Sequence, residues 1–286
     1  MLRILRSLWR FLLAVWTRTS DGHFGLIAAG VAFYAMFAVF PGLGAVVAIW
    51  GLMADPIVIA GYLEVVERFL PDDAAALVHD QVMALVNAPG LTLGWTTLLS
   101  MAVALYSARN GVSALVAGLD VVHRVERRNW LHGMAREFLL TFALIGALIV
   151  ALATIVIVPV LLGYVQFGGL AQRLTRMLPW VAMFALVLSC LAILYRFGPN
   201  LPRGSHSGWI TGGVIFAAFA WAGVSFGFSL YLENFNSYNR IYGSIGAVVI
   251  LMMWLYLSVL AILTGGAINA ELETRRQIRR QMGRRI

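Results

Sequence analysis

The sequence contains no lysine, a single cysteine and few charged residues, and the last two shortages each exclude a class of structure. All 21 basic residues are arginine, and charged residues make up 12% of the 286 positions, against roughly 25% in a typical soluble domain. This composition excludes an ordinary soluble domain. Cys190 has no second cysteine to pair with, so an intramolecular disulfide is also excluded.

Charged residues are absent from the long apolar runs as well. These runs cover residues 25–53, 91–107, 138–164, 177–195, 208–232 and 241–270. Each approaches or exceeds the length of a membrane-crossing helix, and the shortest, 91–107, can gain length by continuing through Arg109 into 112–122. We therefore predict an all-α, polytopic membrane helix bundle with about six transmembrane helices. A proton relay through carboxylates inside the membrane is disfavoured.

The arginines predict how the chain is oriented and organised. With the N-terminus inside, 17 arginines fall in inner segments and four in outer segments, which predicts that both termini are cytoplasmic. Residues 1–19 form an amphipathic helix on the cytoplasmic surface. Residues 20–273 form one membrane domain, in which 54–90 is an acidic outer cap with two short amphipathic helices. Residues 274–286 form a basic cytoplasmic tail.

Polar side chains at the ends of the runs are the candidate binding residues. An arginine or amide at the membrane boundary suits a lipid headgroup, although an arginine there can also simply reach the surrounding phosphates. Pro41 kinks or breaks the first helix, and a break could form a binding site near the midplane. The candidate substrate- or lipid-binding residues are Tyr34, Pro41, Arg109, Asn110, Arg196, Asn200, Tyr242, Asn269 and Glu271.

Catalytic and metal-binding patterns are weak. The sequence has no CxxC, HExxH, GxSxG or P-loop motif, and His79 with Asp80 lacks a convincing metal-ligand spacing. We predict no enzyme activity, catalytic residue, metal or cofactor. The arginines flank apolar runs rather than form a nucleic-acid surface, so the expected partners are membrane lipids, with a homo-oligomer or another membrane protein also open.

Four segments together resemble the YihY/virulence factor BrkB family of bacterial inner-membrane proteins. They are AAGVAFY at 28–34 leading to Phe40 and Pro41, YSARNG at 106–111, YRFGPN at 195–200, and YGSIGA at 242–247 continuing through LMMWLY at 251–256 to GAINAE at 266–271. The resemblance implies an inner-membrane bundle of about six helices, linked in some relatives to envelope integrity or serum resistance.

Relatives have also been labelled ribonucleases, but a nuclease needs carboxylates or an acid and base facing its RNA. Six of the 13 acidic residues lie in the predicted outer cap, away from cytoplasmic RNA. The kink expected at Pro41, the uncharged bundle and the arginines at its boundary motivate the leading hypothesis, a protein that transports or flips a lipid or another amphipathic envelope molecule. The alternative is a scaffold that binds a partner through small-residue faces such as Gly223 and Gly227.

Overall fold

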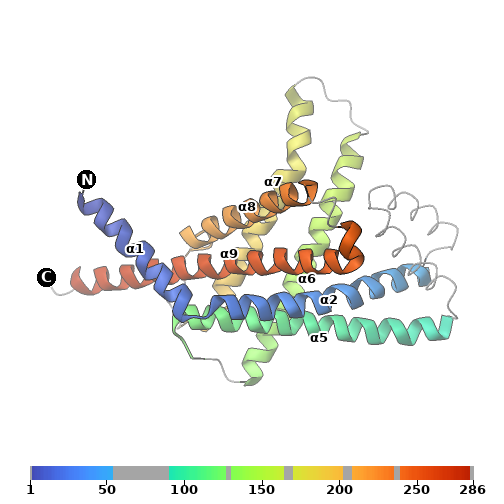
Figure 1. Cartoon of the computed structure of the whole chain (residues 1–286), viewed down its shortest axis with the longest axis horizontal. Coiled ribbons are helices and arrows are strands. Elements are labelled where there is room, and N and C mark those ends of the chain that lie inside the picture. Colours follow the sequence, from blue (N-terminus) through green and yellow to red (C-terminus); the bar gives the residue numbers. More distant parts are fainter. Residues whose placement is uncertain are drawn as a thin grey trace. The chain divides into compact units, whose positions relative to one another are not determined.

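The computed structural model describes residues 2–53, 90–126, 130–163, 170–201, 208–234 and 239–283. Within these ranges it contains seven α-helices and no strand, which confirms the predicted all-α fold (Figure 1). The helices are α1 (Leu2–Asp21), α2 (Phe24–Met53), α5 (Gly90–His123), α6 (Trp130–Gly163), α7 (Leu170–Phe197), α8 (Gly212–Asn234) and α9 (Asn239–Gly283). The predicted outer cap lies outside the described residues, except Gly90.

Each predicted apolar run corresponds to one helix, although the run 208–232 begins four residues before α8, and several helices extend beyond their runs. As expected, α5 continues through Arg109 without interruption. The helix α6 begins at Trp130, not Phe138, and α9 continues to Gly283, well beyond Ala270. Hydropathy marks the part of a helix that hydrocarbon surrounds, whereas Arg, Glu and Gln beyond it are good helix formers. The apolar runs therefore mark only part of these helices: the run in α6 begins after the start of the helix, and the run in α9 stops before its end.

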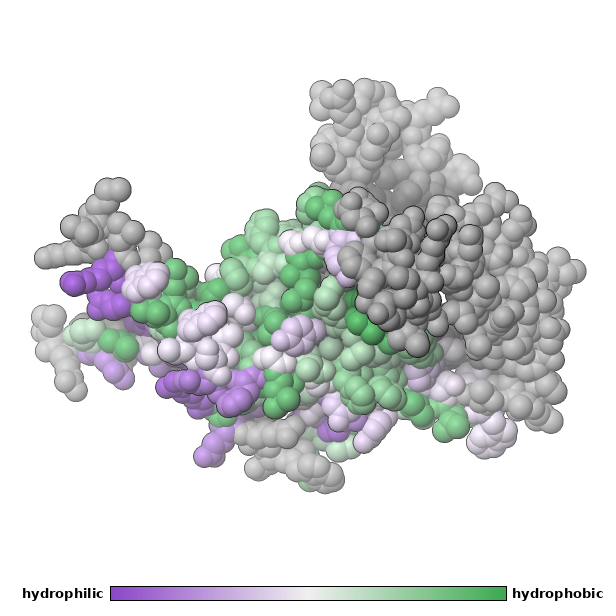
Figure 2. Space-filling model, viewed as in Figure 1, coloured by the Kyte–Doolittle hydropathy of each residue, from purple (hydrophilic) through white to green (hydrophobic). Residues whose placement is uncertain are grey.

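Four described segments are long and apolar enough to cross a membrane. They are Phe24–Gly42, Leu131–Val150, Gly212–Leu232 and Val248–Ile278, and α7 adds the shorter apolar segment Val181–Phe197. Large apolar side chains are exposed on these helices, among them Leu139, Ile149 and Phe219. Figure 2 shows hydrophilic residues over α1 and the last part of α9, and apolar residues over much of the other coloured surface. Hydrocarbon, not water, suits such a surface, so this is a multi-pass membrane protein.

The described chain divides into two compact units. Unit 1 comprises Met1–Ala29, Val112–Phe226 and Leu257–Ile286, and unit 2 comprises Gly30–Gly111 and Gly227–Tyr256. The predicted division into a surface helix, one membrane domain and a basic tail stays a prediction.

Unit 1 is held together by close packing of α8 against α9. A Cβ atom on Gly265 would lie 2.5 Å from the Tyr195 hydroxyl oxygen and 2.6 Å from the Gly213 carbonyl oxygen. The Tyr195 hydroxyl donates a 2.6 Å hydrogen bond to the carbonyl of Ile262, one turn earlier on α9. Only glycine lets the two helices approach this closely, as in other membrane bundles.

In unit 2, α2 lies against α5. A Cβ atom on Gly111 would lie 3.5 Å from Cβ of Tyr34, and one on Gly42 would lie 3.9 Å from Cβ of Ala104. Of the two outcomes expected at Pro41, a break is wrong, because α2 runs through Pro41 as one helix. Membrane helices tolerate an internal proline when neighbouring groups satisfy the freed backbone.

Candidate functional site

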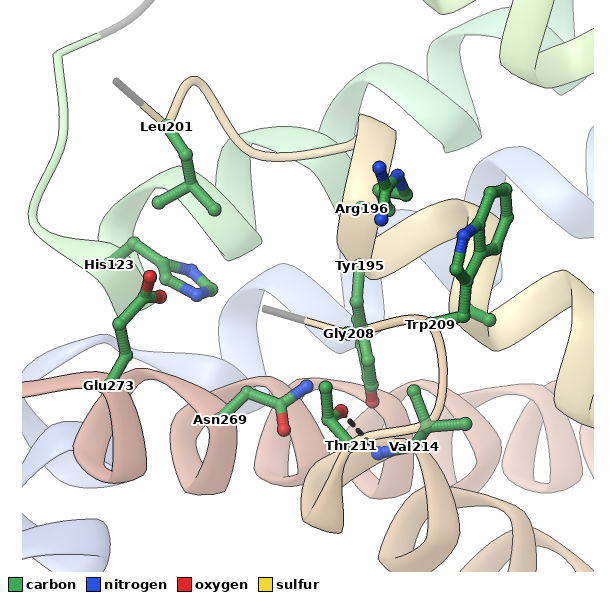
Figure 3. Close-up of a pocket in the computed structure, with 11 residues that line it drawn as sticks. His123, Tyr195, Arg196, Leu201, Gly208, Trp209, Thr211, Val214, Asn269 and Glu273 are labelled. Atoms are coloured by element: carbon green, nitrogen blue, oxygen red, sulfur yellow. Dashed lines mark hydrogen bonds between the residues drawn. The ribbon is translucent and has the colours of Figure 1, made fainter. Parts of the chain in front are cut away.

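A small polar pocket lies in unit 1, where α5, α7 and α9 meet the residues that precede α8 (Figure 3). Its cavity volume is about 20 Å³, which is room for about one water molecule. Two of the predicted binding residues, Arg196 and Asn269, line it. The structure adds His123 and Glu273, whose side chains lie beside each other in Figure 3.

Asn269 and Arg196 both hold the start of α8 in place. The Asn269 side-chain oxygen accepts a 2.8 Å hydrogen bond from the Gly213 backbone N–H, and the Thr211 hydroxyl accepts one from Val214 at 3.3 Å. These bonds satisfy N–H groups that a helix N-terminus leaves open. The Arg196 guanidinium lies 4.6 Å from the centre of the Trp209 ring, a cation–π contact that fastens this segment to the end of α7.

His123 is a titratable residue that lines the polar pocket. Burial lowers the pKa of His123, and the nearby Arg18 lowers it further, while the bond to the Leu119 carbonyl and the charge of Glu273 oppose the shift. Because the Leu119 carbonyl can only accept, the 2.9 Å contact with Nδ1 requires a proton on that nitrogen. The fold therefore favours the neutral imidazole.

We expect the free energy of unfolding to decrease as the pH falls below about 6.5, because the unfolded chain then binds a proton that folded His123 resists. Above that pH the imidazole is neutral in both states, so its contribution is constant. Denaturant unfolding of the detergent-solubilised protein at pH 7.5 and pH 6.0 measures the change. His123→Gln should reduce this pH dependence, whereas His132→Gln, which changes an exposed histidine on α6, should not. Equal slopes for both variants would exclude His123 as the source.

A charged cluster joins α1, α5 and α9. It lies on a different face of α9 from the one that carries Asn269. Glu271 lies between Arg18, at 3.4 Å, and Arg275, at 2.8 Å. Arg18 also donates to the Val122 carbonyl at 3.0 Å and to the Thr274 hydroxyl at 3.1 Å. Residues two apart on a helix point in different directions, so Glu271 and Asn269 are parts of two sites. Glu271 thus helps to tie α1 to α5 and α9.

Asn200 follows α7 and is held by the end of α5. Its backbone N–H donates to the Asp120 carboxylate at 2.7 Å, and its side-chain amide donates to the Glu126 carbonyl at 2.9 Å. Asp120 is buried. These bonds fix the turn that contains Pro199, so the described contacts of Asn200 are those of a structural residue.

A second, larger cavity in unit 1 is apolar. Its volume is about 300 Å³, and helices α5 to α9 all contribute to its walls. The lining residues are Leu115, Leu144, Ala147, Leu148, Met183, Leu186, Val187, Cys190, Leu191, Leu194, Trp221 and Ile262. A volume of this size is at the lower end of the range for small-molecule sites.

The remaining predicted residues belong to unit 2. Arg109 donates a 3.3 Å hydrogen bond to the Asn110 side chain. Tyr34 is partly exposed and stacks edge-on against Phe33, with 5.7 Å between the ring centres. Pro41 lies within α2 and Tyr242 within α9. Whether any of these residues binds a ligand stays a prediction.

Sequence reasoning missed buried carboxylates beyond the ends of the apolar runs. Asp120 and Glu137 are both buried in helices that continue past those ends, and Ser113 donates a 2.9 Å hydrogen bond to Glu137. A carboxylate flanked by apolar residues, as in LDVV at 119–122, was the available signal. In the described part of the chain, no group of three His, Cys, Asp or Glu side chains is placed to hold a metal ion.

Comparison with known proteins identifies the family. The sequence model of the virulence factor BrkB family matches residues 15–285. A Bacillus subtilis protein named ribonuclease-like protein YfkH is 28% identical over 256 residues, which cover 88% of this chain and 90% of that protein. The UPF0761 membrane protein XAC0937 of Xanthomonas axonopodis is 25% identical over 277 residues, which cover 93% of this chain and 61% of that protein.

A third relative, UPF0761 membrane protein XCV0968 of Xanthomonas euvesicatoria, is 25% identical over 60% of its length. This chain therefore spans less than two thirds of the Xanthomonas relatives. No solved structure matches it. The family match covers nearly the whole sequence, as the sequence resemblance predicts, and the chain belongs to the virulence factor BrkB family of membrane proteins.

Proposed function

We propose that this protein binds a lipid or another amphipathic envelope molecule and transports or flips it across the bacterial inner membrane. The apolar cavity of about 300 Å³ in unit 1 is the observation that carries the proposal. The cavity is lined mainly by apolar side chains, and one of them, Leu148, is exposed at the surface, so the cavity suits an apolar ligand that enters from the surrounding lipid.

The chemistry of the rest of the chain is consistent with this function. The predicted orientation rests on arginine counts and puts the polar pocket and the charged cluster on the cytoplasmic side. Buried carboxylates such as Asp120 and Glu271 have structural partners, and the catalytic patterns in the sequence are weak. A non-enzymatic function therefore suits the residues better than the ribonuclease activity in the name of the Bacillus relative.

Filling the cavity is expected to slow transport. Ala147→Trp places a large side chain in the cavity from α6, and we expect it to lower lipid movement about tenfold, which corresponds to ~1.4 kcal/mol in the limiting step. The measurement is the movement of fluorescent phospholipids across liposomes that contain the purified protein. Ala143→Trp is the matched control, because Ala143 is exposed one turn earlier on the same helix.

A second function, a scaffold that binds a membrane partner or a second copy of this chain, is favoured by α8. Gly223 and Gly227 form a GxxxG pair, and a Cβ atom on either would meet no described atom within 4 Å. Such a face suits a close helix partner. If wild-type liposomes move no lipid above empty liposomes, and Gly223→Leu releases a stoichiometric partner, the scaffold replaces the transporter.

A further inference from the structure

We propose that the apolar cavity of unit 1 takes one hydrocarbon chain of a membrane lipid, lying along α7 within a single leaflet. This inference deepens the proposed function, on which it rests for the choice of a lipid as ligand. The hydrocarbon chain of the lipid lies in the cavity, and its headgroup stays outside.

The walls of the cavity select a hydrocarbon chain. They consist of leucine, alanine, methionine, valine and isoleucine side chains, with Cys190 and Trp221 as the least apolar members. No charged side chain is among the described lining residues. Burying a headgroup without hydrogen-bond partners would cost several kcal/mol, whereas a hydrocarbon chain loses nothing by leaving the lipid phase for these walls.

The length of the cavity matches one leaflet. Met183 and Leu194 both line it from α7, and a rise of 1.5 Å per residue separates them by about 16 Å. This is roughly half of the ~30 Å hydrocarbon thickness of a bilayer. Leu194 lies two residues before Arg196, the predicted membrane boundary on α7. The cavity therefore occupies the depth of the leaflet that contains Arg196.

The exposure of the lining residues indicates a sideways entrance. Leu115, Leu191 and Leu194 are at most 7% exposed and form the floor. Leu148, on α6, is 59% exposed and forms part of the rim. A hydrocarbon chain can thus enter the cavity from the surrounding lipid past Leu148. The volume of about 300 Å³ suits one chain and excludes a whole two-chain lipid.

Photo-crosslinking tests the proposal. The full chain is reconstituted in vesicles of phosphatidylethanolamine and phosphatidylglycerol that contain a phospholipid with a diazirine at the middle of one chain. We expect cross-links concentrated on peptides that contain Met183–Leu194 and Leu144–Leu148, reduced about tenfold by Ala147→Trp and unchanged by Ala143→Trp. If Ala147→Trp does not fold, Cys190→Phe fills the cavity from α7 instead.

Two results would overturn the proposal. One is an even spread of cross-links over the exposed faces of α6 and α8, and the other is labelling of the cavity that neither filling variant reduces. Labelling of the cavity without lipid movement would support the binding site for a hydrocarbon chain and refute only the transport function. If Ala147→Trp leaves lipid movement intact and the cavity walls are not cross-linked, the binding site for a hydrocarbon chain is refuted and transport by another route is supported.

Discussion

Glu271→Ala is expected to destabilise the protein by about 3–5 kcal/mol, the usual cost of removing one partner from a buried ion pair. The Glu271 side chain is 11% exposed and lies between Arg18 and Arg275. Its removal leaves the guanidinium of Arg18, which is 13% exposed, and that of Arg275, which is 32% exposed, without the carboxylate that they share. Denaturant unfolding of the purified protein in detergent micelles measures the loss.

The matched control is Glu126→Ala, which removes an exposed carboxylate three residues after the end of α5 and should change stability by no more than about 0.5 kcal/mol. The double variant Arg18→Ala/Glu271→Ala should lose less than the two single variants together, because both remove the same interaction. Equal losses for Glu271→Ala and Glu126→Ala would show that the charged cluster does not stabilise the fold.

Gly265→Ala is expected to destabilise the protein by about 3 kcal/mol, the upper end of the usual cost of overpacking. The added Cβ would lie 2.5 Å from the Tyr195 hydroxyl oxygen, 2.6 Å from the Gly213 carbonyl oxygen and 2.7 Å from Cβ of Ala217. A backbone carbonyl cannot rotate away as a flexible side chain can, so α8 and α9 must separate. The hydrogen bond from Tyr195 to Ile262 would be disturbed at the same time.

Gly223→Ala is the matched control, and we expect it to stabilise the protein instead of destabilising it. No described atom lies within 4 Å of its added Cβ, and replacing glycine by alanine inside a helix stabilises it by roughly 0.5–1 kcal/mol. Thermal unfolding of both variants in the same detergent gives the comparison. A Gly265→Ala protein as stable as Gly223→Ala would contradict the close contact between α8 and α9.

The sequence could predict a site residue only where neighbouring residues in the sequence marked it. Arg196 and Asn269 were predicted as binding residues from their place at the ends of apolar runs, and the polar pocket brings them together. His123 and Glu273 complete that pocket from α5 and α9. Nothing in the sequence indicated that they would meet, because residues so far apart in the chain approach each other only through helix packing. The cavity walls were missed for a different reason: apolar residues on membrane helices look alike whether they face lipid, another helix or a void.

The sequence by itself determined the membrane environment, the helical fold, the continuation of α5 through Arg109 and the membership of the family, since each depends on local hydropathy or on motifs in a fixed order. Only the tertiary structure decided the roles of individual residues. It made Asn269 a helix cap, tied Glu271 to Arg18, and left about 300 Å³ unfilled beside Cys190. The physical reason is that hydrogen bonds, ion pairs and cavities arise between helices, where the partner and its distance depend on how the helices pack.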